Sequence, residues 1–378
     1  MRLNLIGYVS FSVRYGILIL ALLGSRTALG YGPVGHQIIG AIADQKLAKT
    51  PVAAKVATLL DGLTLEDVST YPDEIRGWDK TGPDDPSMFH FTKHPKIDAQ
   101  LRDYWHANPP TKDLNSATPS HHWFHYTDVP VADTEKYGDG QAGRSKWDIV
   151  HMIPYCIAVL KGEVPEDNAR KITKPIALIL LTHFVGDVHQ PLHVGAEFFD
   201  KEGHPANPDK TSGLLEDQGG NSLTLNLTTG GTEQTRHAHF HYYWDSETVA
   251  ANLPPMPDTL SKEEKHAKIE AAKKDLIQEF VTHEPKDWRL PQSVALKDYA
   301  EAWANDIMPI AREAHDRLQF REVAAKQMDD GTIAAAGFLD EKKMPDGVSY
   351  YDWSARIVRQ EMAKAGWRLA DVLEQALR

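Results

Sequence analysis

The segment from Ala177 to Gly195 constrains the fold most, because it places histidines and an aspartate within an apolar stretch. Its first half is apolar at nearly every position, which is typical of a helix buried on all sides. His183 and Asp187 are four residues apart, so they project from the same face of this helix. Pro191 lacks a backbone N–H and clashes with the preceding turn, so we expect the helix to end or kink just before it.

The polar side chains of this segment need partners, because burying an unpaired polar group costs roughly 2–7 kcal/mol. One explanation is a set of core histidines that are satisfied by hydrogen bonds, with Asp187 paired to one of them. The other is a divalent metal ion. Together with His189 and His193 the segment holds three histidines and one aspartate within eleven residues, which favours the metal.

Residues 1–30 have the features of a secretory signal peptide. Arg2 and Arg14 precede an apolar segment that is too short to span a bilayer, and Ala28-Leu29-Gly30 is a small-x-small cleavage pattern. We expect cleavage after Gly30 and a mature domain at 31–378 that is secreted or periplasmic. An uncleaved membrane anchor is the alternative.

The composition is that of a soluble globular protein with a large core: 42% of the 378 residues are hydrophobic and 25% are charged. A formal net charge of −12 at pH 7 argues against a broad cationic surface for duplex nucleic acid. The lone Cys156 excludes an intrachain disulfide. An exported chain of this kind must therefore depend on its core, and on metal, for stability.

Helical periodicity dominates the rest of the chain, so we expect a mainly α, single-domain helical bundle. Two polar stretches at 77–121 and 196–236 indicate long loop insertions, the second with one or two short strands at 221–228. The expected helices cover residues 38–48, 52–60, 70–76, 147–161, 174–190, 237–249, 262–281, 294–325 and 355–377.

A second His-x-x-x-Asp pair occurs at His241 and Asp245. Two independent pairs at helical spacing are much less expected by chance than one. His237 and His239 lie close by, but only His241 has a carboxylate one turn later, so we prefer it as a ligand and interpret the other two as solvated histidines.

Five motifs, in order along the chain, resemble the zinc-dependent S1/P1 nuclease family. The resemblance covers nearly all of 31–378 and implies a fold of the phospholipase C/P1 nuclease type with a trinuclear zinc cleft. It also implies hydrolysis of single-stranded DNA and RNA to 5′-phosphate nucleotides, with 3′-nucleotidase activity. The motifs are YGPVGH at 31–36, PDEIR at 72–76, HYTD at 125–128, THFVGDVHQPLHVG at 182–195 and HYYWD at 241–245.

The resemblance assigns ligands to three Zn²⁺ ions. Cleavage after Gly30 would create the free amine that the third ion needs, so the precursor should lack that ion. Family members usually begin with Trp where this chain has Tyr31. The ligands carried over are Asp73, His125, His183 and Asp187 for the first ion; His193, His241 and Asp245 for the second; and the Tyr31 backbone amine and carbonyl, His36 and the far oxygen of Asp187 for the third.

By the same resemblance, a metal-activated hydroxide attacks the phosphorus, Asp73 orients it, and Arg76 pairs with Asp73 and the phosphate. Tyr126 and Asp128 match positions that form a base pocket, where an aromatic ring stacks on an unpaired base. The structural alternatives are a surface salt bridge from Arg76 to Glu74 or Asp73, a core Tyr126 and a capping Asp128.

Two other functions compete with the nuclease. A zinc-dependent phospholipase C shares the fold, but that relative typically has Glu where this chain has Asp245, and no apolar surface segment beyond the signal suits a membrane. An exported zinc-binding protein without catalysis is opposed by the presence of Asp73 with Arg76. We therefore expect a monomer whose substrates are single-stranded DNA, RNA and 3′-nucleotides, without stable membrane association.

Overall fold

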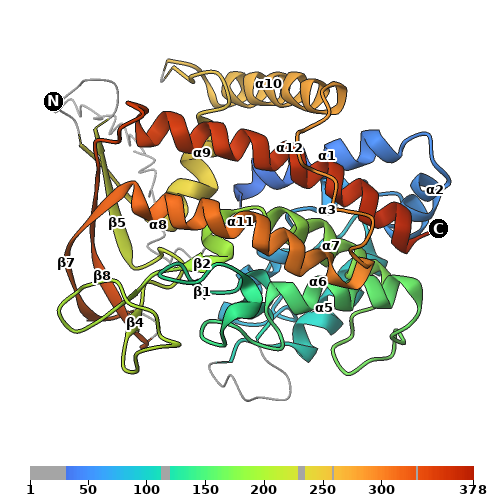
Figure 1. The fold of residues 1–378 in the computed structure, drawn as a ribbon. Helices are drawn as coiled ribbons and strands as arrows, with labels where there is room; N and C mark the ends of the chain where they lie inside the picture. Colours follow the sequence, from blue (N-terminus) through green and yellow to red (C-terminus); the bar gives the residue numbers. More distant parts are fainter. Residues whose placement is uncertain (1–30, 112–119, 229–234, 258, 329–330) are drawn as a thin grey trace, which may run out of the picture.

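The structure is a computed structural model that describes residues 31–111, 120–228, 235–257, 259–328 and 331–378. The expected signal peptide at 1–30 lies outside the described residues. Within the described part, helices form the body of the molecule. A small sheet, made of strands β5, β6, β7 and β8, lies at the left end in Figure 1. No described helix has the length and apolar character needed to cross a bilayer.

Helix α7 (Lys174–Asp187) lies in the interior, and every residue from Ile176 to Asp187 is buried. The Thr173 side chain caps its first turn by accepting a hydrogen bond from the Ile176 N–H. The helix ends at Asp187, and Pro191 opens a 3₁₀ turn, η4 (Pro191–His193), as its missing N–H predicts.

The helices around α7 come from both ends of the chain. Those that pack directly on it include α1 (Gly32–Leu47), α6 (Ile149–Lys161) and α12 (Tyr350–Ala376). The remaining described helices, several of which also contact α7, are α2 (Pro51–Leu59), α3 (Leu65–Val68), α4 (Tyr71–Glu74), η1 (Ile75–Lys80), α5 (Pro95–Ala107), η2 (His121–His125), η3 (Tyr137–Asp139), α8 (Phe240–Tyr242), the π-helical η5 (Tyr243–Glu247), α9 (Thr248–Ala250), α10 (Lys262–Thr282), η6 (Leu296–Asp298) and α11 (Tyr299–Asp316).

The sheet has the strand order β6-β5-β8-β7. Strand β5 (Leu223–Thr228) is antiparallel to β6 (Thr235–His239) and parallel to β8 (Ile333–Glu341), which pairs antiparallel with β7 (Leu318–Gln327). Strand β6 leads directly into α8, so the sheet sets where the HYYWD motif begins.

Two short pairs complete the described strands. β1 (Val129–Pro130) runs parallel to β2 (Gly195–Ala196), and β3 (Phe198–Phe199) is antiparallel to β4 (Leu215–Glu216). The first pair joins the segment that follows His125 to the segment that follows His193. Two of the predicted ligand segments are therefore held side by side by backbone hydrogen bonds.

The prediction of an irregular loop over residues 77–121 was wrong in part, because helix α5 occupies its middle, and residues 112–119 lie outside the described part of the chain. Ile97, Leu101 and Tyr104 recur at helical spacing and are buried. This narrow apolar stripe lies among so many Pro, Asp, Lys and His residues that no sustained period was visible in the sequence.

Two predicted helices were wrong in part. The helix predicted over 294–325 ends at Asp316, and the chain then forms strand β7. The helix predicted over 237–249 starts only after His239, because residues 235–239 form β6, and it is interrupted by a π-helical turn. In both places pairing with a distant strand overrides the local pattern, whereas the strand predicted at 221–228 is confirmed as β5.

A glycine in α12 permits its close approach to α1. A Cβ on Gly366 would lie 2.6 Å from the Ile42 Cβ, a distance that real side chains do not adopt. The two helices can therefore pack at this point only while position 366 has no side chain.

We expect Gly366→Ala to destabilise the protein by about 1–3 kcal/mol through overpacking, although alanine favours a helix by about 1 kcal/mol. Urea unfolding measures the change. Gly138→Ala is the matched control, because the added Cβ would meet only the Glu301 carboxylate at 3.5 Å, and we expect a change within about 0.5 kcal/mol. Equal stability of the two variants would contradict this packing argument.

Candidate metal centre

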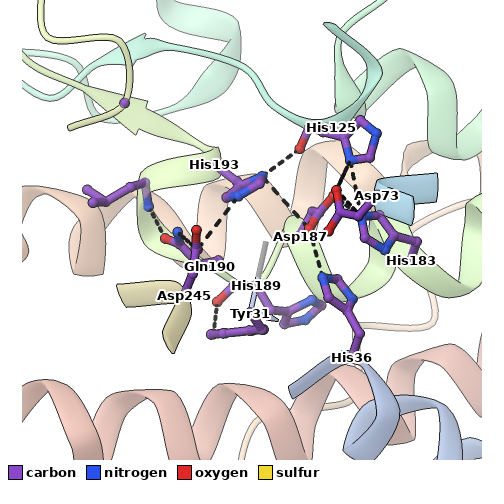
Figure 2. A network of polar contacts seen from close by, with 12 residues as sticks. Tyr31, His36, Asp73, His125, His183, Asp187, His189, Gln190, His193 and Asp245 are labelled. Atoms are coloured by element: carbon purple, nitrogen blue, oxygen red, sulfur yellow. Dashed lines mark hydrogen bonds and ion pairs between the residues drawn. The ribbon is translucent and has the colours of Figure 1, made fainter. Parts of the chain in front are cut away.

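Asp187, at the last turn of α7, is the centre of a network of polar side chains (Figure 2). Its Oδ2 atom lies 3.0 Å from His125 Nδ1 and 3.2 Å from His183 Nε2, whereas its Oδ1 atom lies 3.2 Å from His36 Nε2. Burial acts to raise the pKa of Asp187, but the surrounding imidazoles hold it well below its ordinary value. The carboxylate is therefore ionised and faces imidazoles on both sides.

Asp73 joins this group from α4, which begins at Tyr71 and has Pro72 and Asp73 in its first turn. Its Oδ1 atom lies 3.7 Å from His183 Nε2 and 3.9 Å from His125 Nδ1. Arg76 follows on η1, with its Nη1 atom 3.6 Å from Asp73 Oδ1. The structure thus brings together all four residues predicted for the first ion, and it places Arg76 beside them.

His193, His241 and Asp245 form a second cluster next to the first. His193 Nε2 lies 3.1 Å from His241 Nε2, and His241 Nε2 lies 3.4 Å from Asp245 Oδ2. The π-helical turn over 243–247 therefore still leaves His241 and Asp245 in contact. The two clusters adjoin, because His193 Nδ1 lies 3.9 Å from Asp187 Oδ1.

Backbone carbonyls fix the orientation of three of these rings. The Nδ1 atoms of His183, His193 and His241 lie 2.7, 2.8 and 2.6 Å from the carbonyl oxygens of Ser69, His125 and Gly219 respectively. When Nδ1–H donates to a carbonyl, Nε2 carries the lone pair that can bind a metal. Each of the three rings therefore presents Nε2 to the clusters.

Gly219 makes one of these contacts possible. Its φ of +57° lies in the left-handed region, and a Cβ there would lie 2.7 Å from the Leu192 carbonyl oxygen. The glycine lets the chain turn tightly enough to offer its own carbonyl to His241.

The donor set fits a divalent metal ion. His193 Nε2 and His241 Nε2 face each other at 3.1 Å, and both Nδ1 atoms lie at hydrogen-bond distance from carbonyl oxygens, so with both rings neutral a cation between them would relieve the repulsion of two facing lone pairs. Among the described residues, the buried Oδ1 atoms of Asp73 and Asp187 and both ring nitrogens of His36 form no hydrogen bond. Imidazole nitrogens with carboxylate oxygens are the ligands that zinc prefers.

The protonation states of His125 and His241 suit metal binding, whereas His183 would have to lose a proton: burial acts to lower its pKa, but the Asp187 and Asp73 carboxylates raise it to about 9. Burial and the adjacent imidazoles lower the pKa of His125 and of His241 to about 3, so both rings are neutral at physiological pH. Burial raises the pKa of Asp245 well above its ordinary value. Because a bound cation favours the ionised carboxylate, metal binding would remove this penalty.

His36 and Tyr31 lie on the α1 side of the network. The His36 ring stacks on His183 with centroids 3.9 Å apart, and a Cβ on Gly186 would come within 2.7 Å of His36 Nδ1, so only glycine fits there. The Tyr31 ring is fully buried, and its hydroxyl donates to the His189 carbonyl at 2.5 Å. The Tyr31 carbonyl accepts a hydrogen bond from the Gly35 N–H; its role as a metal ligand stays a prediction.

Tyr126 and Asp128 follow His125 on the segment leading into β1. Burial and the neighbouring Glu216 carboxyl raise the pKa of Asp128 well above its ordinary value. A Cβ on Gly219 would lie 3.5 Å from both Asp128 Oδ1 and His241 Nδ1, which places Asp128 at the edge of the second cluster. The base-pocket role of both residues stays a prediction.

Some histidines fall outside the clusters, and one ligand-orienting residue was missed. His189 is a hydrogen-bonded core histidine, with Nδ1 on the Val185 carbonyl and Nε2 near Arg368, whereas His237 and His239 lie exposed on β6. Gln190 was not predicted: its Nε2 donates to Asp245 Oδ1 at 2.8 Å. Its place directly before the Pro-Leu-His turn was the only signal.

Comparison with known proteins gives a consistent result. The family model described as S1/P1 Nuclease matches residues 31–378. Endonuclease 2 of Arabidopsis thaliana is 27% identical over 145 residues, which cover 35% of this chain and 41% of that protein. Endonuclease 1 of the same organism is 26% identical over 247 residues, which cover 63% of this chain and 59% of that protein. Each alignment thus covers less than two thirds of the relative.

We expect Gly219→Ala to weaken metal binding at the second cluster by about 10–100-fold, because the carbonyl that orients His241 is displaced. Gly213→Ala is the matched control: it also has positive φ, but a Cβ there meets nothing within 4 Å. Calorimetric zinc titration of the metal-free variants measures both. Equal zinc affinity for the two variants would show that the Gly219 carbonyl does not control the site.

Proposed function

The chain belongs to the S1/P1 nuclease family, and from this premise we propose that it is a zinc-dependent phosphodiesterase that hydrolyses single-stranded DNA and RNA to 5′-phosphate nucleotides. The observation that carries the proposal is the convergence of eight predicted ligand side chains into two adjoining clusters around Asp187 and Asp245. We extend the proposal to 3′-nucleotidase activity, since the same centre would hold a terminal phosphate.

With zinc bound, the centre would neutralise part of the phosphate charge and would activate water near neutral pH. The chain's own residues would position the substrate. The side chains of His183 and Asp187 are fully buried, whereas those of Asp73 and Arg76 are 10% and 11% exposed. A phosphodiester would therefore approach from the side of Asp73 and Arg76.

Asp73 and Arg76 suit complementary tasks on that side. Asp73 Oδ1 forms no hydrogen bond with the described residues, so it can accept one from an attacking water molecule and orient it. The Arg76 guanidinium, 3.6 Å from Asp73 Oδ1, can donate to phosphate oxygens and stabilise the charge that develops on them. The salt bridge between Arg76 and Asp73, which is the structural alternative for Arg76, thus also lies beside the metal ligands.

Substrate choice is proposed on two grounds. A net charge of −12 disfavours the extensive phosphate contacts of duplex binding. An unpaired base can stack on Tyr126 at a gain of about 1–3 kcal/mol, which a paired base cannot. We propose that Tyr126 and Asp128 form the base pocket.

We also propose that the functional protein is the exported chain of residues 31–378, acting as a monomer in the periplasm or outside the cell. Removal of residues 1–30 would expose the Tyr31 amine as a third-site ligand. The intact mass and sedimentation of the protein recovered from its native compartment test both points, and a chain that retains residues 1–30 would refute the export proposal.

The activity test uses zinc-loaded protein with a labelled single-stranded oligonucleotide, the matching duplex and a short-chain phosphatidylcholine. We expect 5′-nucleotides from the single strand and loss of activity with a chelator. Release of phosphocholine alone would favour a phospholipase, and zinc binding without any hydrolysis would favour a binding protein.

We expect Arg76→Ala to lower kcat/KM for the single strand by about 100-fold, because one charge-assisted contact to the phosphate is lost. Lys80→Ala is the matched control: Lys80 is an exposed cation on the same 3₁₀ helix and should leave kcat/KM unchanged. Zinc content should be the same in both. An unaltered rate in Arg76→Ala would assign Arg76 to the structural salt bridge alone.

A further inference from the structure

A further cluster of metal-ligating side chains lies outside all the predicted ligands. It consists of Asp79 on η1 and of His121 and His122 on η2, and these residues place one donor atom each within 4.8 Å of one another. Asp79 Oδ2 lies 2.5 Å from His122 Nε2, and Asp79 Oδ1 lies 3.4 Å from His121 Nε2. Both imidazoles therefore use Nε2 toward the two oxygens of one carboxylate.

His121 is the observation that points to a ligand. Its side chain is 1% exposed, yet its Nδ1 atom has no hydrogen-bond partner among the described residues, and its Nε2 atom has only the 3.4 Å contact with Asp79 Oδ1, which lacks hydrogen-bond geometry. Leaving a buried polar group unsatisfied costs about 1–3 kcal/mol. Burial lowers the pKa of His121 to about 4, so at neutral pH the ring is uncharged and can offer a lone pair to a cation.

Neighbouring side chains fix the position of Asp79 and keep it ionised, and His122 packs against His121. The indole N–H of Trp105 donates to Asp79 Oδ1 at 2.8 Å and fixes the carboxylate. Burial would raise the pKa of Asp79, but the two neighbouring imidazoles outweigh it and hold the pKa below its ordinary value, so the group is ionised. The His121 ring is set edge-on to His122, with centroids 4.6 Å apart.

Two of the three side chains are partly exposed. The side chains of Asp79 and His122 are 19% and 24% exposed, whereas His121 closes the inner side. An ion could enter past Asp79 and His122 and keep a solvent molecule as a further ligand, as three-ligand zinc sites do.

We propose that Asp79, His121 and His122 bind an additional Zn²⁺ ion, separate from the clusters around Asp187 and Asp245. Two imidazoles and one carboxylate suit zinc, whereas Ca²⁺ and Mg²⁺ prefer sets of oxygen ligands. With ligand bonds of about 2.0–2.2 Å, donor atoms around a tetrahedral ion lie roughly 3.3–3.6 Å apart. The Asp79–His121 separation of 3.4 Å fits this spacing, and the Asp79–His122 hydrogen bond would lengthen on binding.

Such an ion would act on the candidate metal centre through the backbone. η1 carries Arg76 as well as Asp79, and η2 carries His125 as well as His121 and His122. An ion bound between the two 3₁₀ helices would cross-link them and restrict the movement of Arg76 relative to His125. The proposal assigns the ion a positioning role and does not depend on nuclease activity.

The test is a zinc count on the full protein after equilibration with zinc and removal of unbound metal. We expect His121→Asn and His122→Asn each to hold one zinc equivalent per chain less than the unaltered protein. The matched control is His106→Asn, because His106 pairs with Asp84 at 2.8 Å on the surface and no third ligand joins them among the described residues. This control should keep the full count.

Crystals of the zinc-loaded protein give an independent readout, and we expect an anomalous peak at the zinc edge between Asp79 and His121. His122→Asn covers the case in which the buried His121→Asn fails to fold. An unchanged zinc count in His122→Asn together with no anomalous peak would overturn the proposal and leave a hydrogen-bonded cluster. Loss of zinc in Asp245→Asn reports on the other centre, so the two outcomes are distinguishable.

Discussion

A carboxylate without solvent exposure lies in the core of this protein, and much of the fold compensates for its charge. Moving an isolated ion into a protein interior costs several kcal/mol unless partners surround it. Asp187 receives such partners from α1, η2 and η4, segments that are far apart in the sequence. The interior of α7 can be polar at its end only because these three segments converge on it.

The central part of this arrangement could be predicted from the sequence because it is local. The spacing of His183 and Asp187, the apolar run before them and Pro191 after them determine a buried helix, its end and the direction of its polar face. The donors from remote segments, such as His36 and His125, carry no local signal. Their prediction depended on the family resemblance, and the structure brings both to Asp187.

The rest could not be predicted because it depends on contacts between distant segments. Strand β7 has a sequence that is compatible with a helix, and only its pairing with β8 decides its conformation. Asp79 and His122 are 43 residues apart, across a stretch interpreted as loop, and meet only because α5 folds between them and Trp105 reaches Asp79. Neither contact leaves a periodic pattern in the sequence.

The three carbonyls that orient the metal-facing rings have a consequence for how this site can vary. Ser69, His125 and Gly219 contribute main-chain atoms to these contacts, so the chemical identity of the side chain at position 69 is irrelevant to His183. The path of the backbone therefore determines the orientation of the His183, His193 and His241 rings. A comparison of side chains alone would overlook it, and grafting the histidines onto another scaffold would fail unless those peptide units were carried along.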